Sequence, residues 1–177
     1  MNKAVFLDRD GTLNHDDGYT YKTEDFKLMP GVIEALNLLK GEFVFFIVTN
    51  QSGVGREYYS LDDVHKYNDK MIIELSGEGI EIKKIYICPH GPDDGCDCRK
   101  PSTKYVLDAA KEFDIDLAKS FVIGDHPCDV EMGKRAGCRS VYLLSGHGEK
   151  HIGEGVNADF IAKGMLEAAE WIKDVKG

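Results

Sequence analysis

The sequence has little positive charge for a protein that binds nucleic acids or anionic membranes, and it has no apolar run long enough to span a membrane. Its 22 Lys and Arg residues are outnumbered by 31 Asp and Glu residues, which gives a formal net charge of -9. Nucleic acids and anionic membrane surfaces attract basic patches, and no long run of Lys or Arg offsets this balance. No apolar stretch approaches the roughly 18–20 residues that a membrane span needs. We therefore expect neither a nucleic-acid partner nor a membrane partner.

Cysteines are few and odd in number, which argues against a disulfide framework. The chain has five, and three of them share one segment with a histidine, a pattern more typical of a metal site in a reducing compartment. The first apolar run, within residues 1–8, is short and ends in charge, so it predicts a strand and not a secretory signal. A cytoplasmic location is the expectation.

Short apolar runs alternate with segments of helical periodicity along the 177 residues, of which 42% are hydrophobic. This length suits one domain with a sizeable core, and no repeat or linker interrupts it, so we expect a single domain over residues 1–177. The expected strands are 4–7, 43–48, 82–87, 120–123 and 140–144, with a short edge strand at 160–161. The expected helices are 32–40, 61–75 (N-cap Ser60), 105–113 (N-cap Ser102), 130–136 and 164–175. The alternation predicts an α/β fold with a doubly wound parallel sheet.

Polar clusters follow the ends of the first four expected strands. They are the segments 8–10, 49–52, 88–98 and 124–126. In open α/β sheets the carboxyl ends of the strands border the ligand crevice, so the four clusters are expected to share one site.

Asp8 and Asp10 leave the same face of the chain because strand side chains alternate with period 2. With Asp125 they form a carboxylate set that suits a hard cation such as Mg²⁺. A metal there would screen a phosphate, so that one carboxylate could attack phosphorus and a second could transfer protons. Taken alone, the Asp pair is equally compatible with a strand end that caps a turn.

The segment 88–98 contains a second set of metal-ligand residues. Its spacing is Cys-x-His-x5-Cys-x-Cys, formed by Cys88, His90, Cys96 and Cys98. Three thiolates and an imidazole complete a tetrahedral Zn²⁺ site with no open position, which predicts a structural zinc. The alternative is a reduced loop without metal. We assign no role to Cys128 or Cys138.

Four segments of the chain resemble the motifs of haloacid dehalogenase (HAD) superfamily phosphatases. They are Asp8-Arg-Asp-Gly-Thr-Leu13, Val48-Thr-Asn-Gln-Ser52, Arg99-Lys-Pro101 and Gly124-Asp-His-Pro-Cys-Asp129. The resemblance implies that Asp8 forms a phospho-aspartate and that Asp10 is the general acid and base. It also implies that Thr49 donates to the phosphoryl group, that Lys100 balances negative charge, and that Asp125 binds Mg²⁺. Asp129 is expected either to bind Mg²⁺ or to orient Lys100.

The zinc segment resembles two narrower families of this superfamily, neither of which has a large cap domain. One removes the 7-phosphate from D-glycero-D-manno-heptose 1,7-bisphosphate; the other hydrolyses histidinol phosphate. The stretch Asn14-His-Asp-Asp-Gly-Tyr-Thr-Tyr21 looks more like the heptose family. That resemblance implies a small sugar-phosphate substrate contacted by Asp16, Asp17, Gly18, Tyr19, Asn50, Gln51, Ser52 and Arg99. Heptose enzymes usually have Lys or Arg where this chain has His126, which leaves the binding of a second phosphate open.

Other interpretations remain from the residues alone. A polynucleotide 3′-phosphatase shares the first motif but needs basic surface. A phospho-accepting signalling domain would need neither Asp10 nor the zinc segment. We further expect a monomer, solvated side chains for His147 and His151, and packing roles for Tyr58 and Tyr59.

Overall fold

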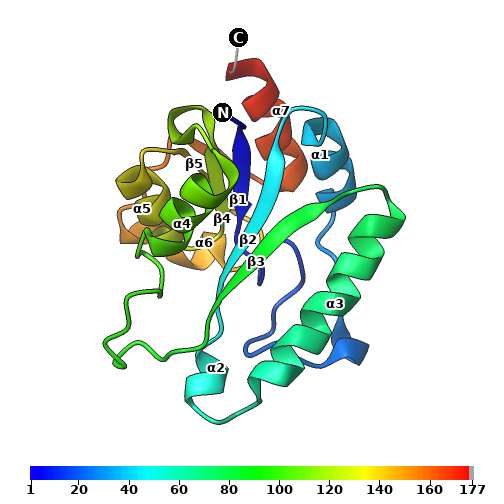
Figure 1. The fold of residues 1–177 in the computed structure, drawn as a ribbon, viewed down its shortest axis with the longest axis vertical. Coiled ribbons are helices and arrows are strands. Elements are labelled where there is room, and N and C mark those ends of the chain that lie inside the picture. Colours follow the sequence, from blue (N-terminus) through cyan, green and yellow to red (C-terminus); the bar gives the residue numbers. More distant parts are fainter. Residues whose placement is uncertain (176–177) are drawn as a thin grey trace.

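The structure, a computed structural model, describes residues 1–175 and contains one six-stranded sheet (Figure 1). Its strands are β1 (Ala4–Leu7), β2 (Val44–Asn50), β3 (Ile82–Cys88), β4 (Phe121–Gly124), β5 (Arg139–Leu143) and β6 (Phe160–Ala162). They lie in the order β3-β2-β1-β4-β5-β6, and every neighbouring pair is parallel. From β1 the chain adds β2 and β3 on one side, and it then crosses to the other side of β1 to add β4, β5 and β6. The crevice between the ends of β1 and β4 is therefore the switch point at which such sheets bind ligands.

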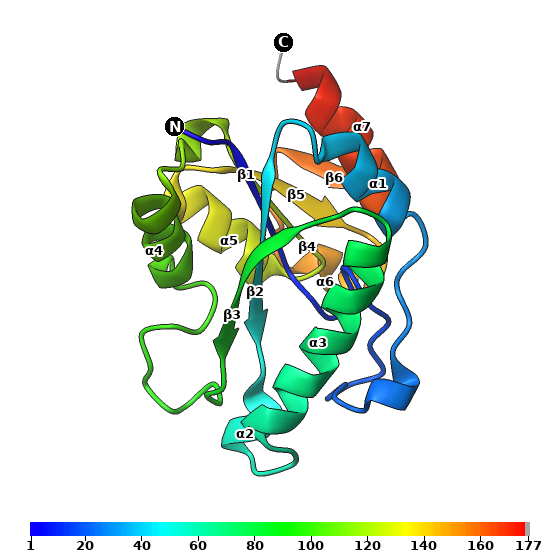
Figure 2. The ribbon, with the colours of Figure 1, turned by 45° about the vertical axis from the view of Figure 1, so that its right-hand side comes forward.

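Helices cover both faces of the sheet (Figures 1 and 2). Helices α1 (Val32–Leu39) and α7 (Met165–Val175) pack on one face, while α4 (Lys104–Phe113) and α5 (Pro127–Ala136) pack on the other. The long helix α3 (Leu61–Gly77) joins the α1 side through Met71 and Leu75. The short elements are α2 (Ser52–Gly55), α6 (Gly148–His151), η1 (Thr23–Asp25), η2 (Leu117–Lys119) and η3 (Ile152–Glu154). The doubly wound parallel fold expected from the sequence is confirmed.

The central strand β1 shows why this order of strands is stable. All four of its residues are buried: Val5 and Leu7 belong to the core under α1 and α7, and Ala4 and Phe6 to the core under α4 and α5. Successive strand side chains point to opposite faces, so a parallel strand covered on both sides must be apolar throughout. The polar residue Asp8 therefore marks the point at which the chain leaves the buried core and reaches the edge of the sheet.

Several boundaries differ from the sequence prediction for local reasons. Helix α5 begins at Pro127 and not at residue 130, because His126 and Asp129 form a capping box and proline suits the first helical position. Ser60 and Asp63 cap α3 as expected. The N-cap of α4 is Thr103, whose side chain makes no capping bond, so the assignment of Ser102 is wrong by one residue. Helices α2 and α6, with four residues each, are too short for periodicity to reveal.

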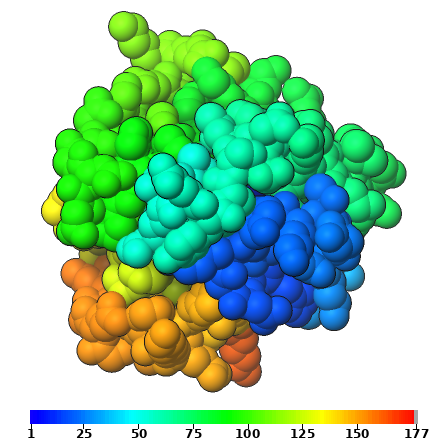
Figure 3. Space-filling model, turned by 90° about the horizontal axis from the view of Figure 1, so that it is seen from below, coloured from blue at the N-terminus to red at the C-terminus, as the bar shows by residue number. Residues whose placement is uncertain are grey.

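The carboxyl ends of β2 and β3 point toward the lower part of the molecule in Figure 1, where α2 and the segment after β3 lie. Seen from that end, the segments in blue, cyan, green and orange border the yellow-green start of α5 (Figure 3). Segments that are far apart in sequence therefore meet at one edge of the sheet. Within residues 1–175, no helix is both long enough and apolar enough to span a bilayer.

Candidate active site and metal clusters

A pocket of about 380 Å³ lies at this edge of the sheet. Most of the sequence-predicted site residues line it, and these are Asp8, Asp10, Asp16, Gly18, Tyr19, Asn50, Gln51, Ser52, Arg99, Lys100 and Asp125. Two predicted residues, Thr49 and Asp17, do not. The lining adds Asp129, for which the sequence left two roles open, and six residues that carry no site assignment from the sequence: Tyr59, His126, Cys128, His147, Lys150 and His151.

The floor of the pocket carries a group of three carboxylates. Asp8 follows β1, Asp125 follows β4, and Asp129 lies in the first turn of α5; one oxygen of each falls within 4.8 Å of the others. Asp8 and Asp125 meet because β1 and β4 are neighbouring parallel strands. The sequence predicted Asp10 as the third member, but its carboxylate lies outside the group because four donors hold it elsewhere. Asp129 takes that place.

Among the described residues 1–175, Lys100 is the one cation that contacts this carboxylate group. Its side chain is 3% exposed, and Nζ lies 2.5 Å from Asp8 Oδ1 and 2.7 Å from Asp129 Oδ1. Burial lowers the pKa of a lysine, but the two carboxylates outweigh burial and raise the pKa of Lys100 above its usual range. Burial raises the pKa of Asp8, and Lys100 opposes that rise. Lysine and carboxylates are thus held as a charged, desolvated cluster.

The carboxylate group is short of positive charge, which makes it fit a divalent cation. Three carboxylates face one ammonium, and burial together with Asp8 raises the pKa of Asp125 to about 8. The group offers oxygen ligands only, which Mg²⁺ prefers. Space around Asp125 is closed: a side chain at Gly11 or Gly146 would overlap its carboxylate, and the backbone N–H of His147 donates to its Oδ2 at 2.7 Å. The donor set and its charge deficit therefore match a small, hard cation.

Asp10 is held by a separate hydrogen-bond network. Arg9 donates from Nε to Oδ1 (3.0 Å) and from Nη2 to Oδ2 (2.9 Å), and Asn14 donates from Nδ2 to Oδ1 (3.0 Å). Gln51 Nε2 donates to Oδ2 at 2.6 Å. Arg9 itself is fully buried, with its guanidinium 4.7 Å from the centre of the Tyr67 ring. Burial raises the pKa of Asp10, and the Arg9 charge opposes the rise. The carboxylate is thereby fixed in one orientation beside Asp8.

The loop 16–20 is tied to the loop after β5. Asp16 accepts hydrogen bonds from the Gly18 backbone N–H (3.0 Å), the Thr20 hydroxyl (2.5 Å) and His147 Nε2 (2.9 Å). Burial favours a higher pKa for Asp16, but the bonds from Thr20 and His147 outweigh it and lower the pKa. The His147 side chain is 39% exposed, in line with the expected solvation, but its ring also bonds Asp16 and its backbone N–H bonds Asp125. One residue thus links the 16–20 loop to the carboxylate group.

Cationic and imidazole groups gather on the wall formed by the segment after β3 and by α5 and α6. Arg99, His126, Lys150 and His151 line the pocket there. The His126 and His151 rings lie 4.7 Å apart, and His151 Nδ1 lies 2.6 Å from Glu154 Oε1, so His151 is not simply solvated either. Burial and the neighbouring His151 lower the pKa of His126. Within residues 1–175, neither Arg99 nor Lys150 forms an ion pair.

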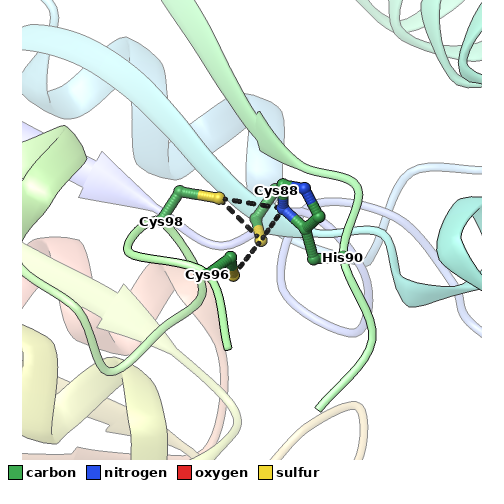
Figure 4. Close-up of side chains that lie close together, drawn as sticks. All are labelled: Cys88, His90, Cys96 and Cys98. Carbon is green, nitrogen blue, oxygen red and sulfur yellow. Dashed lines mark hydrogen bonds between the residues drawn. The ribbon is translucent and has the colours of Figure 1, made fainter. Parts of the chain in front are cut away.

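The second metal-ligand set lies at the end of β3, which supplies Cys88, and in the loop that follows it (Figure 4). Ligand atoms of Cys88, His90, Cys96 and Cys98 all fall within 4.8 Å of one another. Cys88 Sγ lies 3.0 Å from Cys98 Sγ and 3.7 Å from Cys96 Sγ, and His90 Nδ1 lies 3.4 Å from Cys98 Sγ. Backbone N–H groups outweigh burial and lower the pKa of the Cys96 thiol to about 7. Three sulfurs and one imidazole nitrogen around a single point fit Zn²⁺.

The sequence left unassigned several residues that organise the pocket. Arg9 was recognised only as the residue between two aspartates, although a fully buried arginine needs partners and in this protein holds Asp10. Tyr59 was expected to pack, and it does pack against Tyr21 with ring centres 4.6 Å apart, but its hydroxyl also bonds Gln51. Nothing in the local sequence pattern predicts either bond.

Comparisons with known proteins give a consistent result. A family model described as HAD-hydrolase-like matches residues 97–168. The chain is 43% identical over 144 residues to the D-glycero-alpha-D-manno-heptose-1,7-bisphosphate 7-phosphatase of Campylobacter jejuni, covering 81% of this chain and 83% of that protein. It is 38% identical over 184 residues to the beta-anomer phosphatase of Haemophilus influenzae, covering 99% and 100%.

A solved structure agrees with these sequence relatives. The D,D-heptose 1,7-bisphosphate phosphatase of B. bronchiseptica, complexed with magnesium and phosphate, superposes with a TM-score of 0.89 at 32% identity. The match covers 97% of this chain and 98% of that chain.

Proposed function

The chain belongs to the D-glycero-D-manno-heptose-1,7-bisphosphate 7-phosphatase family of HAD-like hydrolases. From this premise we propose that it removes the 7-phosphate of that sugar bisphosphate through a phospho-aspartate on Asp8. The observation that carries the proposal is the Asp8 carboxylate, which lies at the switch point of the sheet, paired with Lys100 and open to the pocket. Relatives that act on either anomer are similar to this chain, so the proposal covers both anomers.

In the first step a carboxylate oxygen of Asp8 attacks the phosphorus of the 7-phosphate. The new O–P bond forms as the bond from phosphorus to the sugar oxygen breaks, and Asp10 gives its proton to that oxygen. In the second step Asp10 takes a proton from water, whose oxygen attacks phosphorus and displaces Asp8. Inorganic phosphate leaves, Asp8 is again a carboxylate, and Asp10 again carries the proton.

Positive charge and donors around Asp8 stabilise the phosphoryl group in these steps. Lys100 is already in place beside Asp8, and the Thr49 hydroxyl accepts a bond from Gln51 Nε2 at 2.9 Å, which leaves its own hydrogen free to donate. We assign Asp8, Asp125 and Asp129 as the residues that hold Mg²⁺; when bound, the metal supplies charge that lets an anionic phosphate approach the carboxylates. The Cys88, His90, Cys96 and Cys98 set is assigned to a structural Zn²⁺.

The zinc loop is proposed to position the two basic residues that follow it directly. Arg99 Nη1 donates to the His90 carbonyl at 3.2 Å, and the Lys100 backbone N–H donates to Asn50 Oδ1 at 3.0 Å. Asn50 therefore supports the substrate pocket through the position of Lys100. A zinc held by His90 and the three cysteines would fix the start of this chain of contacts, which ends at the ammonium group beside Asp8.

The cationic wall supports a substrate with a second phosphate. Arg99 and Lys150 line the pocket and are not ion-paired within the described part of the chain, in a protein of net charge -9. An unpaired guanidinium and ammonium at one wall attract a second anionic group. Histidinol phosphate instead carries an ammonium group beside its phosphate-bearing carbon and an imidazole at its far end, so it offers this wall no second anion. We assign the wall to the 1-phosphate, and the opposite side, with Asp16, Gly18, Tyr19 and Ser52, to the sugar.

The test is phosphate release from both heptose 1,7-bisphosphate anomers and from histidinol phosphate, measured side by side with Mg²⁺ present. We expect the bisphosphates to be hydrolysed at least tenfold faster, judged by kcat/KM. Asp8→Asn should abolish release while circular dichroism stays that of the wild type. Faster release from histidinol phosphate would overturn the substrate, and substantial Mg²⁺-dependent activity of Asp8→Asn would overturn the nucleophile.

A further inference from the structure

Gln51 has both ends of its side-chain amide engaged inside the protein. It is 2% exposed; its Nε2 donates to Asp10 Oδ2 (2.6 Å) and to Thr49 Oγ1 (2.9 Å), and its Oε1 accepts from the Tyr59 hydroxyl (2.9 Å). An amide has a donor end and an acceptor end, so the hydroxyl at Oε1 decides which end faces Asp10. If the amide were turned over, its oxygen would face the Asp10 carboxylate and repel it.

The position of Tyr59 is determined by its surroundings. The residue is 8% exposed, and its ring stacks on Tyr21 with centres 4.6 Å apart. Its edge lies against Gly53, where an added side chain would overlap the Tyr59 ring. Gly53 in α2 and Tyr21 in the loop before η1 therefore aim the hydroxyl at Gln51. Burial, followed by the charge of Asp10, raises the pKa of Tyr59 to about 12, so the hydroxyl keeps its proton at neutral pH.

We propose that Tyr59, acting through the Gln51 amide, is a positioning residue for the proton-transferring carboxylate Asp10. The proposal rests on the proposed function only in taking Asp10 as the group that protonates the leaving oxygen. Gln51 then serves the substrate indirectly: its Nε2 holds one oxygen of Asp10, while Arg9 and Asn14 hold the other. Loss of the tyrosine hydroxyl leaves Oε1 without its donor and frees the amide to rotate.

A purely structural role for Tyr59 makes a different prediction, because packing acts on every substrate alike. Positioning of Asp10 matters only where the leaving oxygen needs a proton. An alkoxide is a poor leaving group and depends on the acid, whereas a p-nitrophenolate leaves without protonation. The ratio of the two rates separates the roles.

The experiment compares Tyr59→Phe with the wild type on glycerol phosphate and on p-nitrophenyl phosphate, by rapid-quench measurement of phosphoryl transfer to Asp8 with enzyme in excess. We expect a five- to tenfold slower transfer from glycerol phosphate, the range of one lost hydrogen bond. Transfer from p-nitrophenyl phosphate should change less than twofold, with KM for either substrate within twofold. Tyr58→Phe is the matched control, because the neighbouring residue Tyr58 is 56% exposed. This substitution should leave both rates unchanged.

A second variant tests whether the effect passes through Gln51. Gln51→Met removes the amide, so Tyr59→Phe added to it should have no further effect on glycerol phosphate. Equal slowing on both substrates, no slowing on either, or multiplying effects in the double variant would each overturn the proposal. Neither probe is a heptose, so a failure of the proposed heptose substrate leaves this test intact. If the wild type hydrolyses no heptose bisphosphate but Tyr59→Phe still slows transfer from glycerol phosphate alone, only the proposed function is overturned.

Discussion

Replacement of Lys100 by methionine tests the charge balance on the pocket floor. The ammonium of Lys100 contacts both Asp8 and Asp129, at 2.5 and 2.7 Å, and its side chain is 3% exposed. Methionine keeps most of the volume and removes the charge. Two buried carboxylates then face each other and Asp125 without a cation, which is the costly way to break a buried ion pair.

The expected loss of stability in the metal-free protein is large. Removal of one partner from a buried pair costs about 3–5 kcal/mol. For a chain of 177 residues, each kcal/mol lowers the melting temperature by about 2–4 °C, so the fall should be about 6–20 °C. The loss should be smaller at pH 6 than at pH 8, because a carboxylate freed from the lysine takes up a proton more easily and relieves the repulsion. Mg²⁺ should restore part of the loss, since it brings positive charge to the same oxygens.

Thermal unfolding, followed by circular dichroism at pH 8 with chelator and then with Mg²⁺, measures these effects. Lys104→Met is the matched control: Lys104 Nζ lies 2.9 Å from Asp108, but its side chain is 40% exposed, so loss of this surface pair should change the melting temperature little. A metal-free Lys100→Met protein that melts within 3 °C of the wild type would show that the carboxylates need no internal cation. A Mg²⁺-induced rise no greater than that of the wild type would contradict the shared-charge argument.

Three further results are expected from metal and glycine positions. Because burial raises the pKa of Asp125 to about 8, the folded state retains a proton that the unfolded state has lost. The free energy of unfolding of the metal-free protein should therefore fall as pH rises from 6 to 8, by up to about 1.4 kcal/mol per pH unit. Asp125→Asn should abolish that slope in urea titrations, and an unchanged slope would contradict the argument. Atomic absorption should find one Zn²⁺ per chain in the wild type and in Cys138→Ser but none in Cys98→Ser, and only Cys98→Ser should lower kcat, at least tenfold. Gly146→Ala should raise the Mg²⁺ concentration for half-maximal activity at least tenfold, because the methyl group overlaps Asp125, while Gly153→Ala, with open space around it, should not.

The sequence predicts those features whose cause is local. Strands β1 and β2 are apolar on both faces and end in polar residues, so their existence and the position of Asp8 can be read directly. The zinc ligands occupy one short loop, so spacing alone brings them together. Asp8 and Asp125 are far apart in the chain, but the rule that ligand crevices lie at the carboxyl ends of parallel strands was enough to group them.

Contacts between separate loops could not be predicted in this way. His147 and Asp16 are 131 positions apart and meet only because the loop after β5 folds over the carboxylate group. Asp10 was expected on the metal because it shares a strand face with Asp8; in the structure the buried Arg9 donates to both of its carboxylate oxygens. Strand periodicity predicts the face of the sheet from which a side chain extends, but the hydrogen-bond donors nearby determine the final position of its carboxylate.

The distribution of paired and unpaired charges connects these contacts to the proposed function. Arg9 is matched by Asp10, and Lys100 by Asp8 and Asp129, all at hydrogen-bond distance and shielded from water. Burial and the neighbouring Asp8 raise the pKa of Asp125, and on the facing wall the exposed Lys150 forms no ion pair within residues 1–175. A buried charge such as that of Asp125 is costly unless a ligand completes it, whereas an exposed cation such as Lys150 can attract an anion at little cost. The two incomplete positions have opposite signs, and they lie where the proposed reaction brings a metal cation and a second phosphate. A ligand that carried only one of these charges would pair with only one of the two positions.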